Sequence, residues 1–246
     1  MYVLGGLVRL LVGLSFVACA VPGHAQIVRL ATGDYPPLAG EGEPGGGLLS
    51  QAVVAAFSTQ GANARLSFLP WQRGFNETRN GDYTATFPYV RNPEREVDFL
   101  FSKVLYSDNI RMFGLSSLGA KPQWAGKSIC IPLGYNTLQV QRFVQAHAAQ
   151  LARPASMLDC FQLLQVGRVQ AVWASETVAE HITRPLRAAG LKYKPLYSEV
   201  DYTVDYFLIV PKRQPDAAKV VQRFNTGLAE IRKSGLFKKI MTSLNP

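Results

Sequence analysis

Histidine and cysteine are scarce in this chain, with three of each among 246 residues. No HExxH, CxxC or Gly-x-Ser-x-Gly motif occurs. A zinc site or a Ser-His-Asp triad needs several such side chains brought together, and the sequence offers too few. We therefore expect no metal site, no cofactor and no catalytic residue, and we expect His147 and His181 on helix surfaces.

The carboxylates and glycines form no catalytic or phosphate-binding pattern either. Glu94 and Glu96, and the acidic residues between positions 199 and 205, lie in charged stretches that we interpret as solvated loops. The glycine-rich stretch 40–47 lacks the Gly-Lys-Ser/Thr ending of a phosphate-binding loop. These features favour a binding protein over an enzyme.

Long apolar runs are absent apart from a short one near the N-terminus. Residues 10–20 are almost entirely apolar, follow a segment whose one charge is Arg9, and precede a Pro-Gly break and the small residue Ala25. A membrane span takes about 20 residues, and a buried helix would need a polar face that this run lacks. The layout is typical of a signal peptide. We predict a signal peptide at 1–25, cleaved after Ala25, and export to the periplasm.

The mature chain is basic. Removal of residues 1–25 from the 246-residue chain leaves 221 residues and lowers the net charge from +9 to +8, because the leader contains one Arg and no acid. A basic protein suits nucleic acid, an anionic envelope surface or an anionic ligand. Export excludes nucleic acid, and the basic stretch 232–239 is interpreted as a solvated helix face.

The cysteines agree with export. Cys19 belongs to the leader, where lipid attachment is the less favoured alternative to cleavage because Phe16 fits poorly at the first position of a lipobox. Cys130 and Cys160 remain, and two thiols in an oxidising compartment predict one disulfide. Two buried free thiols are the alternative.

Strand-like and helix-like segments alternate along the mature chain, which predicts an α/β fold with mostly parallel sheets flanked by helices. The alternation of strands and helices begins again after a linker at 119–126, so we expect two α/β lobes with a ligand crevice between them. We predict strands at 27–32, 65–69, 83–87, 110–115, 128–131, 170–173, 191–196 and 206–210. We predict helices at 48–60, 71–80, 138–151, 158–166, 176–189, 215–234 and 236–244.

Several short motifs occur in the order and spacing found in family 3 periplasmic solute-binding proteins of the amino-acid-binding type, which the whole mature chain resembles. They are Tyr35-Pro36-Pro37-Leu38, Gly81-Asp82-Tyr83, Glu94-Arg95 with Phe101-Ser102 and Tyr106, Gly126-Lys127-Ser128-Ile129 with Gly134, Gly167-Arg168-Val169-Gln170-Ala171, and Ser234-Gly235-Leu236-Phe237. The resemblance implies a type II fold of two hinged lobes, one formed by 26–113 and 207–246 and the other by 114–206. It also implies a monomer that closes on a small ligand for a membrane permease or a sensor.

The resemblance carries ligand-binding roles onto particular residues. Arg95 matches an arginine that grips the ligand carboxylate; an ion pair with Glu94 or Glu96 at the surface is the alternative. Trp71 matches a position that packs on the ligand, although it would also suit the core. The full set of expected ligand-binding residues is Tyr35, Trp71, Phe87, Pro88, Tyr89, Arg95, Gly134, Tyr135, Asn136 and Ser175.

One departure from the family pattern concerns the ligand itself. Ser175 stands where amino-acid binders usually place an Asp for the α-ammonium group, with Glu176 beside it. A neutral side chain cannot pair with an ammonium, so we expect a small carboxylate or other anion with an apolar or aromatic body. Two alternatives remain: a dehydratase-like enzyme with Glu176 as acid or base, and an interaction module without a ligand.

Overall fold

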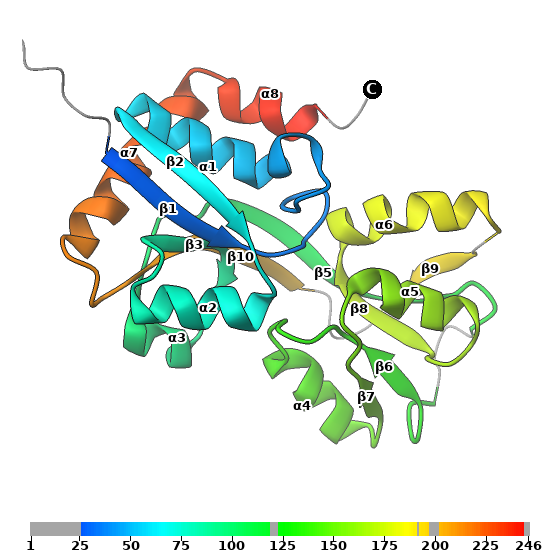
Figure 1. The fold of residues 1–246 in the computed structure, drawn as a ribbon. Coiled ribbons are helices and arrows are strands. Elements are labelled where there is room, and N and C mark those ends of the chain that lie inside the picture. Colours follow the sequence, from blue (N-terminus) through cyan, green and yellow to red (C-terminus); the bar gives the residue numbers. More distant parts are fainter. Residues whose placement is uncertain (1–25, 119–122, 191, 197–201, 244–246) are drawn as a thin grey trace, which may run out of the picture.

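The computed structural model describes residues 26–118, 123–190, 192–196 and 202–243. The expected signal peptide at 1–25, with Cys19, lies outside the described residues, as do half of the expected linker and the acids Glu199 and Asp201. Nowhere in the described ranges is a helix long and apolar enough to cross a membrane. The chain forms two lobes (Figure 1), and one ten-stranded sheet extends through both.

Lobe 1 is built on three parallel strands, β1 (Gln26–Thr32), β2 (Ala62–Phe68) and β3 (Ala85–Val90). The 3-10 turn Pro44–Gly46 leads into α1 (Leu48–Thr59), which packs with α7 (Ala217–Lys233) and α8 (Leu236–Thr242) on one side of the sheet (Figure 1). Helices α2 (Trp71–Asn80) and α3 (Pro93–Asp98) lie on the other side, and β4 (Phe99–Phe101) follows α3.

Small residues let α1 and α7 approach each other closely. A β-carbon on the buried Gly227 of α7 would stand 1.9 Å from the carbonyl oxygen of Ala56 in α1. Beside this contact the rings of Phe57 and Phe224, both fully buried, have centroids 5.4 Å apart. This contact fixes the C-terminal part of the chain onto the N-terminal part of the same lobe.

Lobe 2 repeats the pattern with three parallel strands, β6 (Ser128–Cys130), β7 (Gln150–Ala152) and β8 (Ala171–Ser175). Helices α4 (Leu138–Ala146), α5 (Met157–Gln165) and α6 (Glu176–Ala188) surround them, and β9 (Tyr193–Leu196) completes this side of the sheet. A disulfide joins Cys130 of β6 to Cys160 of α5, with their Cα atoms 5.5 Å apart. The predicted disulfide and the two-lobed α/β fold are confirmed. Each lobe contains three parallel strands as expected, but the sheet as a whole is mixed, because its other pairings are antiparallel.

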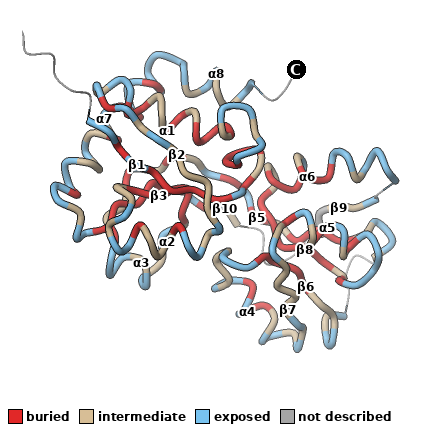
Figure 2. Tube along the Cα trace, in the orientation of Figure 1, coloured by how far each residue is buried: buried red, intermediate tan, exposed pale blue. Residues whose placement is uncertain are grey.

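Two long antiparallel strands connect the lobes: β5 (Tyr106–Leu115) and β10 (Tyr202–Pro211). Residues 106–110 of β5 pair with β10, whereas 110–115 pair with β8 and β9 of lobe 2. Residues 206–211 of β10 pair with β3 and β4 of lobe 1. Figure 2 shows that buried residues follow these strands from one lobe into the other. The lobe limits expected at 113/114 and 206/207 fall within these two strands.

Several sequence-based expectations about secondary structure were wrong; Asp205, for example, lies in β10 and not in a loop. The helix expected at 138–151 ends at Ala146, because Ala148 adopts a left-handed φ of 51° and residues 150–152 form β7 alongside β6. Glu94 and Glu96 lie in the first turn of α3 rather than in a loop, since Asn92 caps that helix by accepting a hydrogen bond from the Arg95 backbone N–H at 2.8 Å.

Candidate ligand-binding site

A cavity of about 190 Å³ lies between the two lobes. Lobe 1 contributes side chains from the turn after β1, the start of α2, the end of β3 and α3, while lobe 2 contributes the segment after β6, the start of α4 and the end of β8. The middle of β5 and the first half of β10 form the remaining wall. The lining residues are Tyr35, Trp71, Pro88, Tyr89, Val90, Arg91, Arg95, Ile110, Ile131, Gly134, Tyr135, Asn136, Leu138, Gln139, Trp173, Ala174, Ser175, Tyr202, Val204 and Tyr206.

The structure gathers most of the residues that the sequence singled out. Tyr35, Trp71, Pro88, Tyr89, Arg95, Gly134, Tyr135, Asn136 and Ser175 all line this cavity. Phe87 is not among the lining residues. Its side chain is fully buried in the core of lobe 1, and its carbonyl oxygen accepts a hydrogen bond from the Thr32 hydroxyl at 2.8 Å.

Sequence reasoning missed the wall formed by the connecting strands. Tyr202, Val204 and Tyr206 alternate along β10 and present one side of that strand to the cavity. This period-two pattern is visible in the sequence, but the expected strand began only at residue 206. Trp173 of β8 was assigned to the strand at 170–173 and not to the site.

Aromatic side chains from both lobes meet across the cavity. The ring centroid of Tyr35 in lobe 1 lies 5.6 Å from that of Tyr135 in lobe 2, in an edge-to-face arrangement. Trp71 makes similar edge contacts with Tyr35 at 6.4 Å and with Tyr135 at 6.5 Å. Edge-to-face pairs at these distances are attractive. The lobes are therefore in direct contact through side chains that also line the cavity.

Arg95 is the half-buried cation of the site. Its guanidinium donates to the Val90 carbonyl oxygen at 2.6 Å and lies 4.9 Å from the ring centroid of Tyr89. Burial lowers the pKa of Arg95. In the described part of the chain no carboxylate comes within ion-pair distance of it, and Glu96 pairs with Arg91 at 3.0 Å instead. A partly desolvated guanidinium without a carboxylate is suited to hold an anion.

The lining contains no Asp or Glu. Ser175 caps α6 by accepting a hydrogen bond from the Val178 backbone N–H at 3.3 Å, and Tyr35 and Tyr206 share a hydrogen bond of 2.5 Å between their hydroxyls. Burial raises the pKa of Tyr89 to about 12, and it raises the pKa values of Tyr35 and Tyr206 as well, so these tyrosines present neutral hydroxyls.

One buried carboxyl group lies behind the residues that line the cavity. Asp108 of β5 is 7% exposed and does not line the cavity. Its Oδ1 accepts from the Asn109 backbone N–H at 2.8 Å. Burial raises the pKa of Asp108, although the hydroxyls of Ser175 and Thr177 oppose that effect. Nothing in the sequence pattern distinguished Asp108 from a surface acid.

Glu176, the acid considered for catalysis, lies outside the cavity lining. Its carboxylate forms an ion pair with Arg111 and accepts a hydrogen bond from the Asn109 side chain at 2.8 Å. Partial burial raises its pKa, but the hydrogen bonds from Asn109 and Arg111 outweigh that effect and lower it overall. The described residues also contain no cluster of three or more His, Cys, Asp or Glu side chains that could hold a metal ion.

Comparison with solved structures identifies the architecture. An ancestral arginine-binding protein bound to arginine superposes with a TM-score of 0.76 at 18% identity, covering 89% of this chain and 98% of that one. The chain has the two-lobed fold of periplasmic binding proteins. The GluR0 ligand-binding core from Nostoc punctiforme in complex with L-glutamate matches with a TM-score of 0.71 at 15% identity, covering 87% of this chain and 97% of that one.

The same fold occurs in a receptor context. A histidine kinase sensor domain with similarity to periplasmic binding proteins matches with a TM-score of 0.73 at 18% identity, covering 89% of this chain and 95% of that one. No protein-family model matches the sequence, and a search of curated proteins finds no match. At these identities the comparisons establish the fold, and the ligand has to be argued from the side chains.

Proposed function

We propose that this chain is a periplasmic solute-binding protein that captures a small anionic ligand between its lobes, as a monomer, without transforming it. One observation carries this proposal: Arg95 lines a cavity whose lining contains no acid. An anion can be paired there at low cost, whereas a buried cation would find no carboxylate partner. The fold supports a clamp in which ligand binding draws the two lobes together about β5 and β10.

The ligand is proposed to be a small carboxylate with an apolar or aromatic body and not a standard α-amino acid. Ser175 is neutral, and Asp108 stands behind the wall and not in it. Trp71, Tyr135 and Trp173 supply aromatic surface for the ligand body. The cavity of about 190 Å³ is smaller than the roughly 300–1,000 Å³ of sites for drug-sized molecules, so the ligand is correspondingly small.

The enzyme alternative is not favoured. A general acid or base must reach the reacting group and have a pKa near the working pH. Glu176 is paired with Arg111, has a lowered pKa and does not line the cavity. We also propose a partner: a membrane permease or a sensor that recognises the closed form of the protein.

A thermal-shift screen tests the ligand class. The panel contains the twenty standard amino acids, their deaminated counterparts such as 3-phenylpropionate, and aromatic carboxylates such as benzoate and indole-3-acetate. At about a hundredfold excess over Kd a ligand adds about 2.7 kcal/mol of stability, or roughly 5–10 °C in Tm for a chain of this size. We expect carboxylates without an ammonium group to give this shift. A shift with amino acids alone would contradict the proposed ligand class.

The proposed location has an independent test. Intact-mass analysis of the periplasmic fraction should give a chain that begins at Gln26, and size-exclusion chromatography should give a monomer. A mass that retains residues 1–25, or a lipid adduct on Cys19, would contradict cleavage after Ala25.

A further inference from the structure

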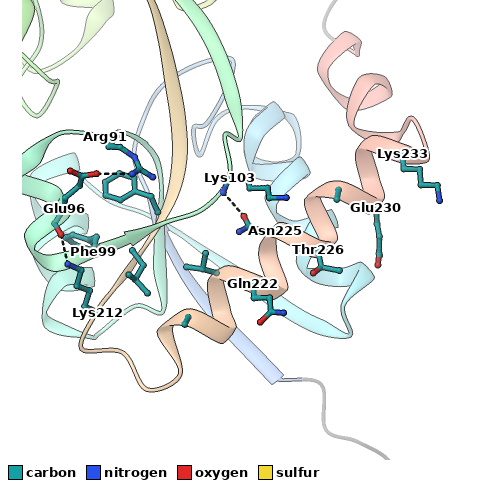
Figure 3. A pocket seen from close by; sticks show the side chains of 15 residues that line it. Arg91, Glu96, Phe99, Lys103, Lys212, Gln222, Asn225, Thr226, Glu230 and Lys233 are labelled. Carbon is teal, nitrogen blue, oxygen red and sulfur yellow. Dashed lines mark hydrogen bonds and ion pairs between the residues drawn. The ribbon is translucent and has the colours of Figure 1, made fainter.

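A second and larger concavity lies on the outside of lobe 1, between β4 and α7. Its volume is about 880 Å³ (Figure 3). Side chains of α7 form one wall, and the segment from Arg91 to Lys103 with Lys212 forms the other. The lining includes no residue of lobe 2, so movement of the lobes does not close it. We call it the outer groove.

The floor of the outer groove is apolar. Leu100 and Phe101 of β4 and Val221 of α7 line it and are only half-buried, so part of their apolar surface faces solvent. Strand β4 pairs with β10 and with no other described strand, which leaves its second edge open beside the groove. A concave apolar surface of this kind is typical of a site that receives side chains of another molecule.

The rim of the outer groove is basic. Lys103, Lys212 and Lys233 line it, and none of them pairs with a carboxylate in the described part of the chain (Figure 3). The amine of Lys212 donates to the backbone oxygen of Glu96 at 2.7 Å, while the Glu96 carboxylate is taken up by Arg91. Glu230 is the other acid on the rim. With Arg91 and Glu96 paired, three lysines and the carboxylate of Glu230 remain on the rim, so the groove carries a net positive charge.

Arg91 connects the outer groove to the inter-lobe cavity, because it lines both. Its guanidinium carbon lies 4.6 Å from the ring centroid of Phe101 on the groove side and 5.2 Å from that of Phe207. A molecule seated in the groove would contact a residue that also lines the ligand cavity.

We propose that the outer groove docks an acidic, amphipathic peptide segment of a partner protein. Apolar side chains of the segment would cover Leu100, Phe101 and Val221, and its carboxylates would reach Lys103, Lys212 and Lys233. The basic rim is complementary to the acidic side chains of such a segment, and the apolar floor is complementary to its aliphatic side chains. The proposal does not depend on which solute binds between the lobes.

Selection from a phage-displayed library of random linear peptides tests it. The mature protein is the bait, and the double variant Lys103→Glu/Lys233→Glu is the counter-selection. The control Lys238→Glu/Lys239→Glu makes the same change in net charge on exposed residues of α8 that do not line the groove. Selected peptides are synthesised and their affinities for all three proteins are measured by fluorescence anisotropy at low salt.

We expect the peptides that depend on the groove to be rich in Asp, Glu and apolar residues. They should bind the Lys103→Glu/Lys233→Glu variant at least about tenfold more weakly than the control variant, because two attractive charge contacts become repulsive. Groove-dependent peptides without acids would overturn the proposal, and so would the recovery of no groove-dependent peptide. Binding of the protein to anionic phospholipid vesicles through Lys103 and Lys233, in the absence of peptide binding, would assign the groove to a membrane surface and also overturn it.

Discussion

Gly134 of lobe 2 lies directly against Trp71 of lobe 1, so that a β-carbon on Gly134 would stand 2.7 Å from the Trp71 Cβ. Real β-carbons do not approach this closely. Gly134→Ala should therefore hold the lobes apart, at a cost of about 1–3 kcal/mol typical of overpacking. We expect a ligand found in the screen to bind about 5- to 150-fold more weakly, as measured by isothermal titration calorimetry.

A matched variant separates this contact from backbone strain. Gly126 is also in lobe 2 and has a φ of 72°, similar to the 80° of Gly134, but a β-carbon there meets no atom within 4 Å. Gly126→Ala should lower the melting temperature through left-handed strain and leave affinity unchanged. Equal loss of affinity in the two variants would show that the Gly134–Trp71 contact is not part of closure.

Arg95→Ala should weaken binding of a carboxylate ligand about tenfold to a hundredfold, because a charged hydrogen bond contributes roughly 1.5–3 kcal/mol. Arg95→Lys should recover part of the loss, since an ammonium keeps the charge but not the fork of two N–H donors. The control is Arg79→Ala, which removes an exposed guanidinium from α2 near Asp98. If Arg95→Ala binds the ligand as the natural protein does, Arg95 is not the anion anchor.

Removal of the disulfide should destabilise lobe 2 without changing the chemistry of the cavity. The bridge spans a sequence separation of 30 residues, and the chain-entropy model gives about 3–4 kcal/mol for a loop of this length. The variant Cys130→Ala/Cys160→Ala should lose up to that amount in urea unfolding. Alkylation of the unfolded, non-reduced natural protein should label neither cysteine, and labelling of both would contradict the bridge.

Asp108 should make stability depend on pH. Burial raises its pKa in the folded chain above the unfolded value of 3.8, so the folded state holds the proton more tightly. The contribution of Asp108 to the free energy of unfolding is greatest below pH 3.8 and decreases as the pH rises from 3.8 to the folded pKa. Above the folded pKa it no longer changes with pH. Asp108→Asn should thus raise Tm at neutral pH, and the difference should shrink as the pH approaches 3.8.

The measurement is a series of melting curves from acid to neutral pH. Asp82→Asn, at an exposed aspartate, controls for the loss of one negative charge. A lower Tm of Asp108→Asn at neutral pH would show that the fold requires the ionised carboxylate.

Local sequence patterns were sufficient to predict elements whose ends are marked by proline or glycine. Helix α2 occupies the residues predicted for it, because Pro70 precedes it and Gly81 ends it with a φ of 96°. The same reasoning failed for β4 and β7, which have three residues each, although the equally short β6 was predicted at 128–131. Residues 150 and 151 were predicted as the end of a helix, and pairing of β7 with β6 overrides that local preference.

The site was predictable where a motif carried it and not where distant segments meet. Arg95, Trp71 and Tyr135 were found through the resemblance, and the structure brings them to one cavity. The wall of Tyr202 and Tyr206 arises because β10 pairs with β5, nearly a hundred residues earlier in the chain. No local pattern encodes such a pairing. The outer groove is likewise formed by β4 and α7, which are far apart in the sequence.

The close contact between Gly227 and Ala56 has a consequence for biosynthesis. Because β10 and α7 are translated after the whole of lobe 2, α1 and the sheet of lobe 1 have to wait for them to complete their core. Lobe 2, whose strands and helices from β6 to β9 are contiguous, can fold meanwhile. Lobe 1 of the nascent chain would in this way remain incomplete until α7 is synthesised. Substituting Gly227 would then disturb assembly of lobe 1 at its final step, after lobe 2 has already formed.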